Sequence, residues 1–299
     1  MLLSTLGGGV SVLGIGGGVW WGFDLCNHFQ MQYLVFQALC VVAVLGLRRF
    51  RWALVPALWL CVPVLKLAPY YTAATAESPW PRHLKVLSFN VLHKNKRYAD
   101  TVSWVQATDP DIAFFPEATK AWEAGLAPLK ATMPHSIVHA RWDNFGLAVF
   151  SKHPIVEQSL VPSTAVGVVM LQVTLEIDGR RVVFVGVHPA SPLSAAYSRD
   201  RDEVLQDLAK RLNHETRPMI VAGDFNATPW SHAMQPLFDA DLRDTMLGRG
   251  FSATWRRGLP LVAIPIDHIL VGGRISTAKR WTGPDLGSDH RPIVAELLW

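Results

Sequence analysis

The stretches GDFNATP at residues 223–229 and SDHRP at residues 288–292 give the strongest indication of the fold of this chain. The first directly follows the apolar run 219–222, and the second directly precedes the apolar run 293–297. Short runs rich in Val and Ile are typical of buried strands, and the ends of strands are where a rigid scaffold aims polar side chains into one cleft. We therefore expect two strands whose polar ends contribute to a common site.

Four further apolar runs end beside a polar side chain of the same kinds. The side chains at these places are Asn90, Glu117, His188 and Asp267. Taken singly, each has an ordinary structural interpretation, such as a loop cap, the start of a helix or a buried histidine. Six such clusters in one domain favour a shared chemical role instead.

The residues after 83 follow the rhythm of a mixed α/β domain, because short runs of Val, Ile and Phe alternate with longer amphipathic or polar stretches. Leucines spaced among charged residues over 193–212 predict a helix between two strands. The expected strands are 84–89, 112–115, 147–150, 168–177, 182–187, 219–222, 268–271 and 293–297.

The polar residues at the strand ends suit a hard metal ion. Carboxylate and amide oxygens are the ligands that Mg²⁺ and Mn²⁺ prefer, and Glu117, Asn90 and Asp289 would provide them. A zinc site is disfavoured, because all three cysteines lie before residue 62 and no His-Glu-x-x-His spacing occurs. We expect Mg²⁺ or Mn²⁺ as the cofactor.

The order and spacing of these motifs resemble the endonuclease/exonuclease/phosphatase superfamily, which has the deoxyribonuclease-I-like fold. The motifs are LSFNVL at 87–92, FFPEAT at 114–119, VGVHPASP at 185–192, GDFNATP, IDHILV at 266–271 and GSDHRPIVAEL at 287–297. The resemblance covers about residues 84–299. It implies a four-layer α/β sandwich of two packed sheets flanked by helices, and hydrolysis of a phosphoester by a metal-dependent enzyme.

The resemblance also implies roles for individual residues. Asn90 and Glu117 would hold the metal. Asp224 would orient or deprotonate the attacking water, and His290, oriented by Asp267, would stabilise the phosphorane. The phosphate contacts would be His188 and Asn226. Apart from the resemblance, Arg199 on the helix that follows HPASP has a planar guanidinium group that suits a further phosphate contact, and the alternative is that it is a solvated helix residue.

The first 72 residues predict a membrane anchor of about three helices. Three nearly uncharged stretches, 2–23, 29–47 and 52–71, each approach the roughly 20 residues that cross a bilayer. The third is interrupted by prolines, so two crossings plus a surface helix is the alternative. A polar, proline-containing linker over 73–83 then leads to the catalytic domain, residues 84–299.

The cluster Arg48, Arg49 and Arg51 lies between the second and third stretches, and the tendency of basic loops to stay in the cytoplasm sets the orientation. With three crossings, the catalytic domain is expected on the periplasmic or exterior side of a bacterial inner membrane. If the third stretch does not cross, only two crossings remain and the catalytic domain is expected on the cytoplasmic side instead.

Charge says little about the substrate. Of 28 basic and 24 acidic residues, residues 1–79 hold four and two, which leaves a net charge of +2 on the remainder. Proteins that grip long nucleic acids usually concentrate Lys and Arg on one face, whereas here they are scattered. Three alternatives therefore stay open: a nuclease, a hydrolase of phospholipids or other small phosphoesters, and an inactive membrane scaffold of the same fold.

Overall fold

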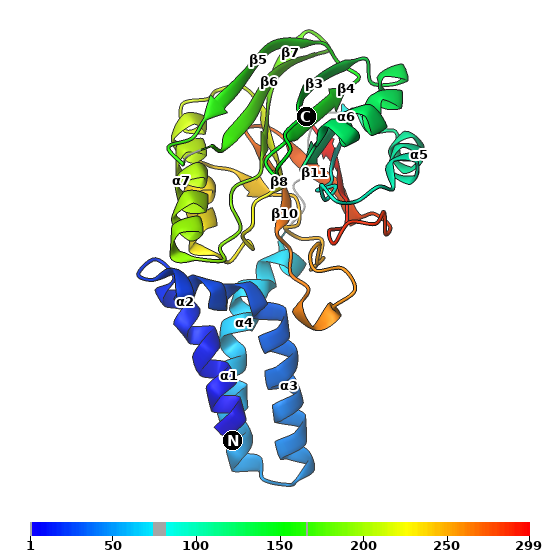
Figure 1. Ribbon diagram of the computed structural model, residues 1–299. Helices are drawn as coiled ribbons and strands as arrows, with labels where there is room; N and C mark the ends of the chain where they lie inside the picture. Colours follow the sequence, from blue (N-terminus) through cyan, green and yellow to red (C-terminus); the bar gives the residue numbers. More distant parts are fainter. Residues whose placement is uncertain (1, 74–81, 166) are drawn as a thin grey trace.

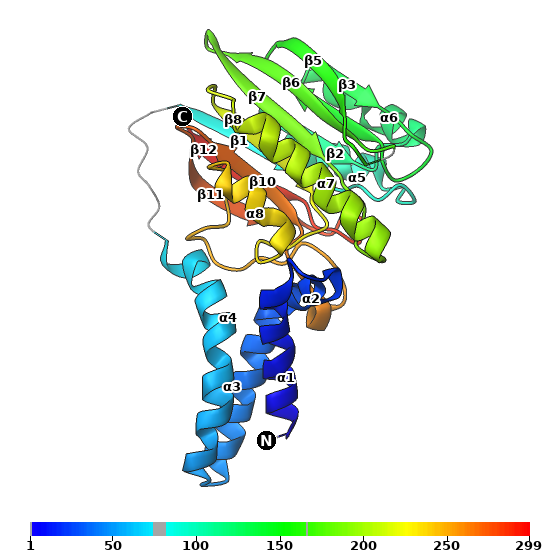
Figure 2. The same cartoon turned by 90° about the vertical axis from the view of Figure 1, so that its left-hand side faces the viewer.

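The computed structural model describes residues 2–73, 82–165 and 167–299. A globular head stands on a bundle of helices, with the N-terminus at the free end of the bundle and the C-terminus in the head (Figures 1 and 2). Most of the predicted linker, residues 74–81, lies outside the described residues.

Two six-stranded mixed sheets form the centre of the head. One has the order β11-β12-β1-β2-β4-β3, and the other has the order β5-β6-β7-β8-β10-β9. Within them β1 pairs with β2 and β7 pairs with β8 in parallel, while the other pairs are antiparallel. The strands are β1 (His83–Ser88), β2 (Ile112–Pro116), β3 (His135–His139), β4 (Leu147–Ser151), β5 (Ile155–Pro162), β6 (Val169–Ile177), β7 (Arg180–Val187), β8 (Met219–Asp224), β9 (Arg243–Asp244), β10 (Asp267–Gly272), β11 (Ser276–Thr282) and β12 (Ile293–Leu298).

Three buried apolar layers hold the head together. The inner faces of the two sheets pack through side chains such as Phe114, Leu171 and Ile220. The helices α7 (Ala195–Leu212) and α8 (Gln235–Asp239) cover the outer face of one sheet, and α5 (Tyr98–Thr108) and α6 (Lys120–Leu126) cover the outer face of the other. Helices, sheet, sheet and helices are the four layers that the sequence predicts, so this prediction is confirmed.

Every strand and the helix expected from the sequence are present, with ends shifted by at most a few residues. The expected runs match β1, β2, β4, β6, β7, β8, β10 and β12, and the expected helix matches α7. The sequence missed β3, β5, β9 and β11, and these four are the edge strands of the two sheets. The long edge strands β5 and β11 are mostly exposed or half-buried, so they lack the apolar pattern on which the prediction rests.

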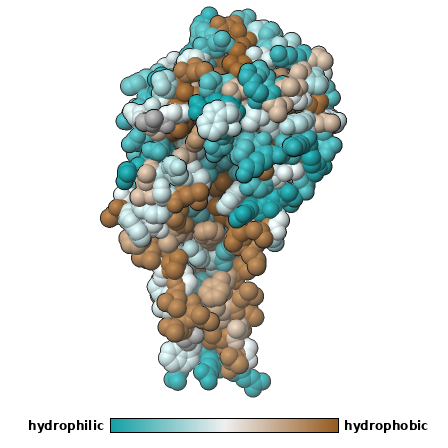
Figure 3. Space-filling view, in the orientation of Figure 1, coloured by the Kyte–Doolittle hydropathy of each residue, from teal (hydrophilic) through white to brown (hydrophobic). Residues whose placement is uncertain are grey.

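The bundle consists of α1 (Leu2–Leu13), α3 (Gln30–Gly46) and α4 (Leu54–Thr72), and its surface is largely hydrophobic (Figure 3). Polar side chains inside it join α1 to α3, since the Ser4 hydroxyl donates to the Gln37 amide oxygen at 2.8 Å. Hydrogen bonds of this kind between helices are typical of packing in membranes. Two helical segments, Trp21–Gly46 and Phe50–Thr72, are long and apolar enough to cross a bilayer.

The first apolar stretch differs from the expectation of one spanning helix over 2–23. The helix α1 has 12 residues, about 18 Å at the rise of an α-helix. A 3₁₀ turn at Gly14–Gly16 ends it, and the short α2 (Trp21–Leu25) then lies across the top of the bundle (Figure 1). Glycines disfavour helix continuation, and the break coincides with four glycines within the five residues 14–18, one more than in the run at 7–9 that α1 contains.

A buried ion pair fastens α2 to the head. Asp24 accepts a hydrogen bond from Arg201 Nη2 at 2.9 Å, and both side chains are almost fully inaccessible. The same carboxylate accepts from the Ser231 hydroxyl at 2.6 Å and the His232 main-chain amide at 2.7 Å. Beside this cluster, the Trp230 indole donates to the Lys66 carbonyl of α4 at 2.9 Å. The helical bundle and the head are therefore packed together.

We expect the substitution Asp24→Ala to lower the free energy of unfolding by about 3 kcal/mol, because it leaves the Arg201 guanidinium buried without its main partner. This value is at the lower end for a broken buried pair, since Asp202 stays 2.8 Å from Arg201. Urea unfolding of the full chain in detergent would measure it. The control Asp178→Ala removes an exposed pair with Arg82 and should cost under about 1 kcal/mol. Equal effects in the two variants would contradict the expectation.

Candidate active site

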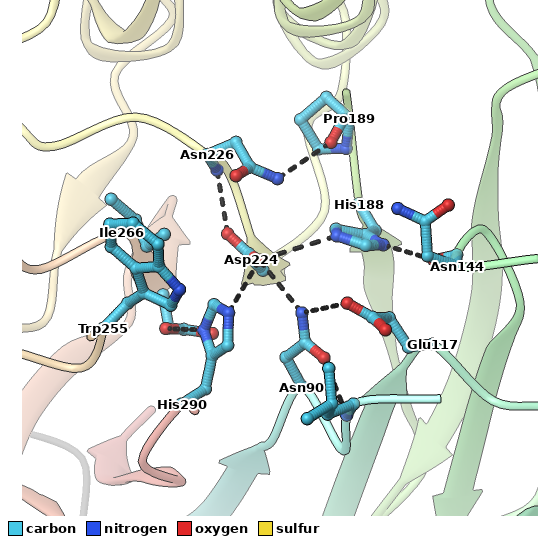
Figure 4. Close-up of polar contacts among 12 residues, drawn as sticks. Asn90, Glu117, Asn144, His188, Pro189, Asp224, Asn226, Trp255, Ile266 and His290 are labelled. Carbon is cyan, nitrogen blue, oxygen red and sulfur yellow. Dashed lines mark hydrogen bonds and ion pairs between the residues drawn. The ribbon is translucent and has the colours of Figure 1, made fainter. Parts of the chain in front are cut away.

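The carboxylate of Asp224, at the end of β8, lies at the centre of a buried polar cluster (Figure 4). Its Oδ2 accepts a hydrogen bond from Asn90 Nδ2 at 3.0 Å and lies 3.5 Å from His188 Nε2 and 3.6 Å from His290 Nε2. Burial alone would raise the pKa of Asp224, but the charge of His290 and the contacts of His188 outweigh it and lower the pKa to about 2. Asp224 is therefore ionised at neutral pH.

His290 is held between two carboxylates. Antiparallel pairing of β8 with β10 sets Asp267 opposite Asp224, and Asp267 Oδ2 lies 2.8 Å from His290 Nδ1. Burial would lower the pKa of His290, but the charges of Asp267 and Asp224 outweigh it and raise the pKa to about 10. The imidazole is thus a cation at neutral pH, with Nδ1 committed to Asp267 and Nε2 directed at Asp224.

His188 and Asn226 border the same carboxylate from β7 and from the loop after β8 (Figure 4). His188 Nδ1 bonds the main-chain carbonyl of Asn144 at 2.8 Å, which leaves Nε2 facing Asp224. Burial would lower the pKa of His188, but the hydrogen bond and charge of Asp224 raise it above its ordinary value. Asn226 donates its main-chain amide to Asp224 Oδ1 at 2.9 Å and its side-chain amide to the Pro189 carbonyl at 3.0 Å.

Glu117 and Asn90 form the other side of the cluster. Asn90 Nδ2 donates to Glu117 Oε1 at 3.1 Å, while Glu117 Oε2 accepts from the main-chain amide and Nδ1 of His93 at 2.9 Å and 2.8 Å. Burial would raise the pKa of Glu117, but the charge of His188 and the hydrogen bonds from His93 and Asn90 lower it. A second buried carboxylate is thus kept ionised beside Asp224.

The backbone adopts strained conformations at two of these positions. Glu117 has φ +63° and Asn226 has φ +49°, both in the left-handed region that residues with a Cβ rarely occupy. Gly223, with φ +153°, has no alternative, because a Cβ there would lie 2.0 Å from the Val187 carbonyl oxygen. Strain concentrated at the ends of β2 and β8 is typical of a functional site.

Asp289 and Arg199 lie differently from the rest of the predicted site. Asp289 Oδ2 accepts from the Trp255 indole at 3.1 Å, and Oδ1 lies 4.0 Å from His290 Nε2 and is buried without a hydrogen-bond partner. Arg199 is exposed on α7, and it is not among the described residues that contact Asp224. Its role as a phosphate contact stays a prediction.

Sequence reasoning missed three residues that support the cluster. His93 holds Glu117, and only its place three residues after Asn90 hinted at this. The Ser288 hydroxyl donates to the Asn90 carbonyl at 2.8 Å, and the SDHRP motif contains it. Trp255 comes from a loop without a motif, so no local signal indicated its bond to Asp289.

The donors present suit a divalent metal ion. The ionised carboxylate of Glu117, the amide of Asn90 and the unpartnered oxygen of Asp289 are hard oxygen ligands. A second set, Asp224, Asp267 and His290, has ligand atoms within 4.8 Å of one another. The raised pKa of His290 makes this set less suitable, because a protonated imidazole has no lone pair for a metal.

The fold of the head occurs in several solved structures. An endonuclease/exonuclease/phosphatase from Beutenbergia cavernae is 21% identical, with a TM-score of 0.60 over 73% of this chain and 72% of that one. D. rerio TDP2 complexed with a single strand DNA product is 16% identical, with a TM-score of 0.62 over 73% and 99% of the chains. Sphingomyelinase C from Streptomyces griseocarneus is 20% identical, with a TM-score of 0.54 over 72% and 99%.

Curated relatives include UPF0294 proteins of Vibrio cholerae, which are 28% identical over 120 residues. The match takes in 40% of this chain and 41% of the relative, so it spans about two fifths of that protein. The model of the Endonuclease/Exonuclease/phosphatase family matches residues 87–290, which include all the residues of the cluster around Asp224. Because this match extends over more than half of the chain, the protein belongs to the Endonuclease/Exonuclease/phosphatase family.

Proposed function

We propose that the protein is a membrane-anchored, divalent-metal-dependent phosphodiesterase. The observation that carries the proposal is the convergence of Asn90, His188 and His290 on the single carboxylate of Asp224, with Glu117 beside it. An ionised acid flanked by cationic donors provides an acceptor for water and positive charge for a phosphate in one place. Family membership supports the same reaction class, since the structural relatives include a sphingomyelinase C.

Glu117, Asn90 and Asp289 would hold the Mg²⁺ or Mn²⁺ ion. When bound, the metal would neutralise negative charge on a phosphate oxygen. His93 would keep the Glu117 carboxylate in place through its two hydrogen bonds, a task that supporting residues of metal sites commonly perform. The Trp255 indole would do the same for Asp289.

Asp224 would orient the attacking water. Its carboxylate is a weak base, because a pKa of about 2 leaves it little affinity for a proton. It would therefore act mainly by accepting a hydrogen bond from the water and aligning the oxygen lone pair with phosphorus. The main-chain amide of Asn226 and the side chain of Asn90 fix the carboxylate for this purpose.

His290, His188 and Asn226 would contact the phosphate. The His290 cation is kept charged by Asp267 and would stabilise the developing phosphorane from Nε2. His188 is oriented by the Asn144 carbonyl, so its Nε2 also faces the site. Asn226 uses one amide proton on Pro189, and its other amide proton is available for a phosphate oxygen.

The anchor supports an orientation with the head outside the cytoplasm. The turn between α3 and α4, which carries Arg48 and Arg49, lies at the end of the bundle remote from the head (Figure 1). If α3 and α4 both cross, the basic turn and the head lie on opposite sides of the membrane, whatever the path of α1. Retention of basic loops in the cytoplasm then gives a bacterial inner-membrane protein with a periplasmic or exterior catalytic head.

Nucleic acid and phospholipid both remain candidate substrates, and an inactive scaffold is the third alternative. D. rerio TDP2 is solved with a single strand DNA product, whereas sphingomyelinase C is named for a lipid. The scaffold alternative is disfavoured by the intact cluster around Asp224, since loss of activity usually removes such groups. A substrate panel separates the three.

The full chain in detergent should hydrolyse a phosphodiester in the presence of Mg²⁺ or Mn²⁺ and lose this activity in EDTA. Asp224→Asn should lower turnover by roughly 10²–10³-fold, because the amide offers the water a weaker acceptor. The panel comprises bis(p-nitrophenyl) phosphate, single-stranded DNA and a phospholipid. Asp178→Ala, on the exposed surface, is the control. Absence of cleavage of all three substrates would favour the scaffold.

Glu117→Gln should raise the Mg²⁺ concentration for half-maximal activity by at least about tenfold, because it removes a charged ligand while keeping the shape of the side chain. A metal titration of the rate measures the effect. Glu123→Gln is the matched control, since Glu123 lies six residues further on and pairs with Lys120 at the surface. An unchanged metal requirement in Glu117→Gln would exclude Glu117 as a ligand.

Asp267→Asn should move the loss of activity at alkaline pH to lower pH by roughly 1–3 units. The charge of Asp267 is the main cause that raises the pKa of His290 to about 10, and the protonated imidazole is the active form. Activity of the normal chain should thus persist until the pH approaches 10. The variant should lose its activity at a lower pH and regain it when the solution is acidified. The profile of kcat/KM against pH measures this.

Asp244→Asn is the matched control, because Asp244 forms a second buried pair of the same kind with His268, at 2.7 Å. This variant should leave the alkaline limb of the pH profile in place. If the alkaline limb moved equally in both variants, general destabilisation, and not the loss of charge on His290, would cause the loss of activity at alkaline pH.

A further inference from the structure

A cavity of about 840 Å³ lies between the membrane helix α3 and the loop over residues 251–263. This volume is in the range of roughly 300–1,000 Å³ typical of ligand pockets. The loop descends from the head beside α3 (orange in Figure 1) and contains the 3₁₀ turn Pro260–Val262. Gln32 of α3 donates to the Ala263 carbonyl at 2.8 Å, which ties the two walls together at one end.

One wall of the cavity is apolar and belongs to the membrane segment. It is formed by α3 residues including Val35, Phe36 and Leu39, which are 51%, 38% and 62% exposed. The tip of the loop adds Leu261, which is 86% exposed. Large apolar side chains left open at the level where a spanning helix meets the head are typical of contact with lipid.

The other wall is basic. Arg256, Arg257 and Arg291 all line the cavity, and none of its described lining residues is acidic. Arg257 is held by the Ser288 carbonyl at 2.7 Å and by Asp285 at 2.6 Å, but Arg256 and Arg291 are exposed. A guanidinium group is well suited to bind a phosphate because its planar fork matches the phosphate oxygens.

The cavity shares a wall with the candidate active site. Trp255 lines the cavity, and its indole donates to Asp289 at 3.1 Å on the other side. Its ring lies 6.4 Å from the ring of His290, centroid to centroid. Thr254 also lines the cavity, and its hydroxyl oxygen accepts a hydrogen bond from the main-chain amide of Asp267 at 3.1 Å. One layer of side chains therefore separates the cavity from the catalytic cluster.

We propose that the cavity binds the hydrocarbon chain of an amphiphilic phosphodiester, so that a lipid substrate presents its phosphate to the site from the membrane surface. The inference rests on the proposed function. The chain would lie along Val35 and Leu39, and the phosphate would pass Arg256 and Trp255 to reach His290. Hydrolysis would form a P–O bond from water and break one P–O ester bond, and the departing alkoxide would take up the proton that water releases.

The test compares two substrates of the same bond type on the full chain in detergent: lysophosphatidylglycerol, which has one hydrocarbon chain, and water-soluble bis(p-nitrophenyl) phosphate. Val35→Trp with Leu39→Trp fills the cavity. Val42→Trp with Leu45→Trp, on exposed positions of α3 outside the cavity, is the matched control. We expect kcat/KM for the lipid to fall at least about tenfold in the filled variant alone, with the soluble substrate unaffected.

The charge of the basic wall is tested in the same way. Arg256→Glu should weaken hydrolysis of the anionic lipid by about tenfold or more, while Arg274→Glu, on the exposed turn between β10 and β11, should not. An undiminished lipid rate in the filled variant, or an equal loss on both substrates, would overturn the proposed cavity function.

A binding measurement separates failure of this inference from failure of the proposed function. Fluorescence anisotropy of a labelled lysophosphatidylglycerol, titrated with the full chain in EDTA, requires no catalysis. Binding that is lost on filling the cavity but kept in the α3 control would support the lipid site even if neither substrate were cleaved. Equal binding by the filled and normal chains, together with cleavage of the soluble substrate, would keep the phosphodiesterase and exclude the lipid site.

Discussion

A cation held between two buried carboxylates is the interaction on which this site depends. The register of β8 and β10 forces Asp224 and Asp267 into neighbouring positions on one sheet, where both are nearly inaccessible to water. Two buried negative charges so arranged are costly unless a positive charge lies close to both. His290 meets that requirement, and it is brought there by the approach to β12 in the other sheet. Electrostatic balance at the site is therefore coupled to the packing of the two sheets.

The same principle joins the helical bundle to the head. Asp24 is buried in the interface and is balanced by Arg201, whose Nη1 also donates to the main-chain carbonyl of Asn226 at 3.3 Å. Two residues further along, Thr228 bonds His28 of the anchor at 3.1 Å. The loop that follows Asp224 is thus held by β8 at one end and by the anchor a few residues later. The helical bundle therefore contributes to the position of the loop that carries Asn226.

These contacts also determine where the cluster lies relative to the helical bundle. His232, which contacts α2 at the top of the bundle, lies only eight positions after Asp224. The loop over 251–263 reaches α3 and at the same time provides Trp255 to the site. Consequently the cluster around Asp224 is linked at two points to the end of the bundle that faces the head.

The local sequence was sufficient to predict the central strands, the helix α7 and the residue types around Asp224, because buried strands and their polar ends have a short-range pattern. The edge strands β5 and β11 escaped prediction because exposed strands lack that pattern, and the break after α1 was hidden within a continuous apolar stretch. Tertiary structure alone decided that His93 supports Glu117, that Trp255 reaches Asp289, and that Asp24 pairs with Arg201 across 177 positions. Such contacts depend on how distant segments meet in space, and a linear pattern does not encode the partner of a buried charge.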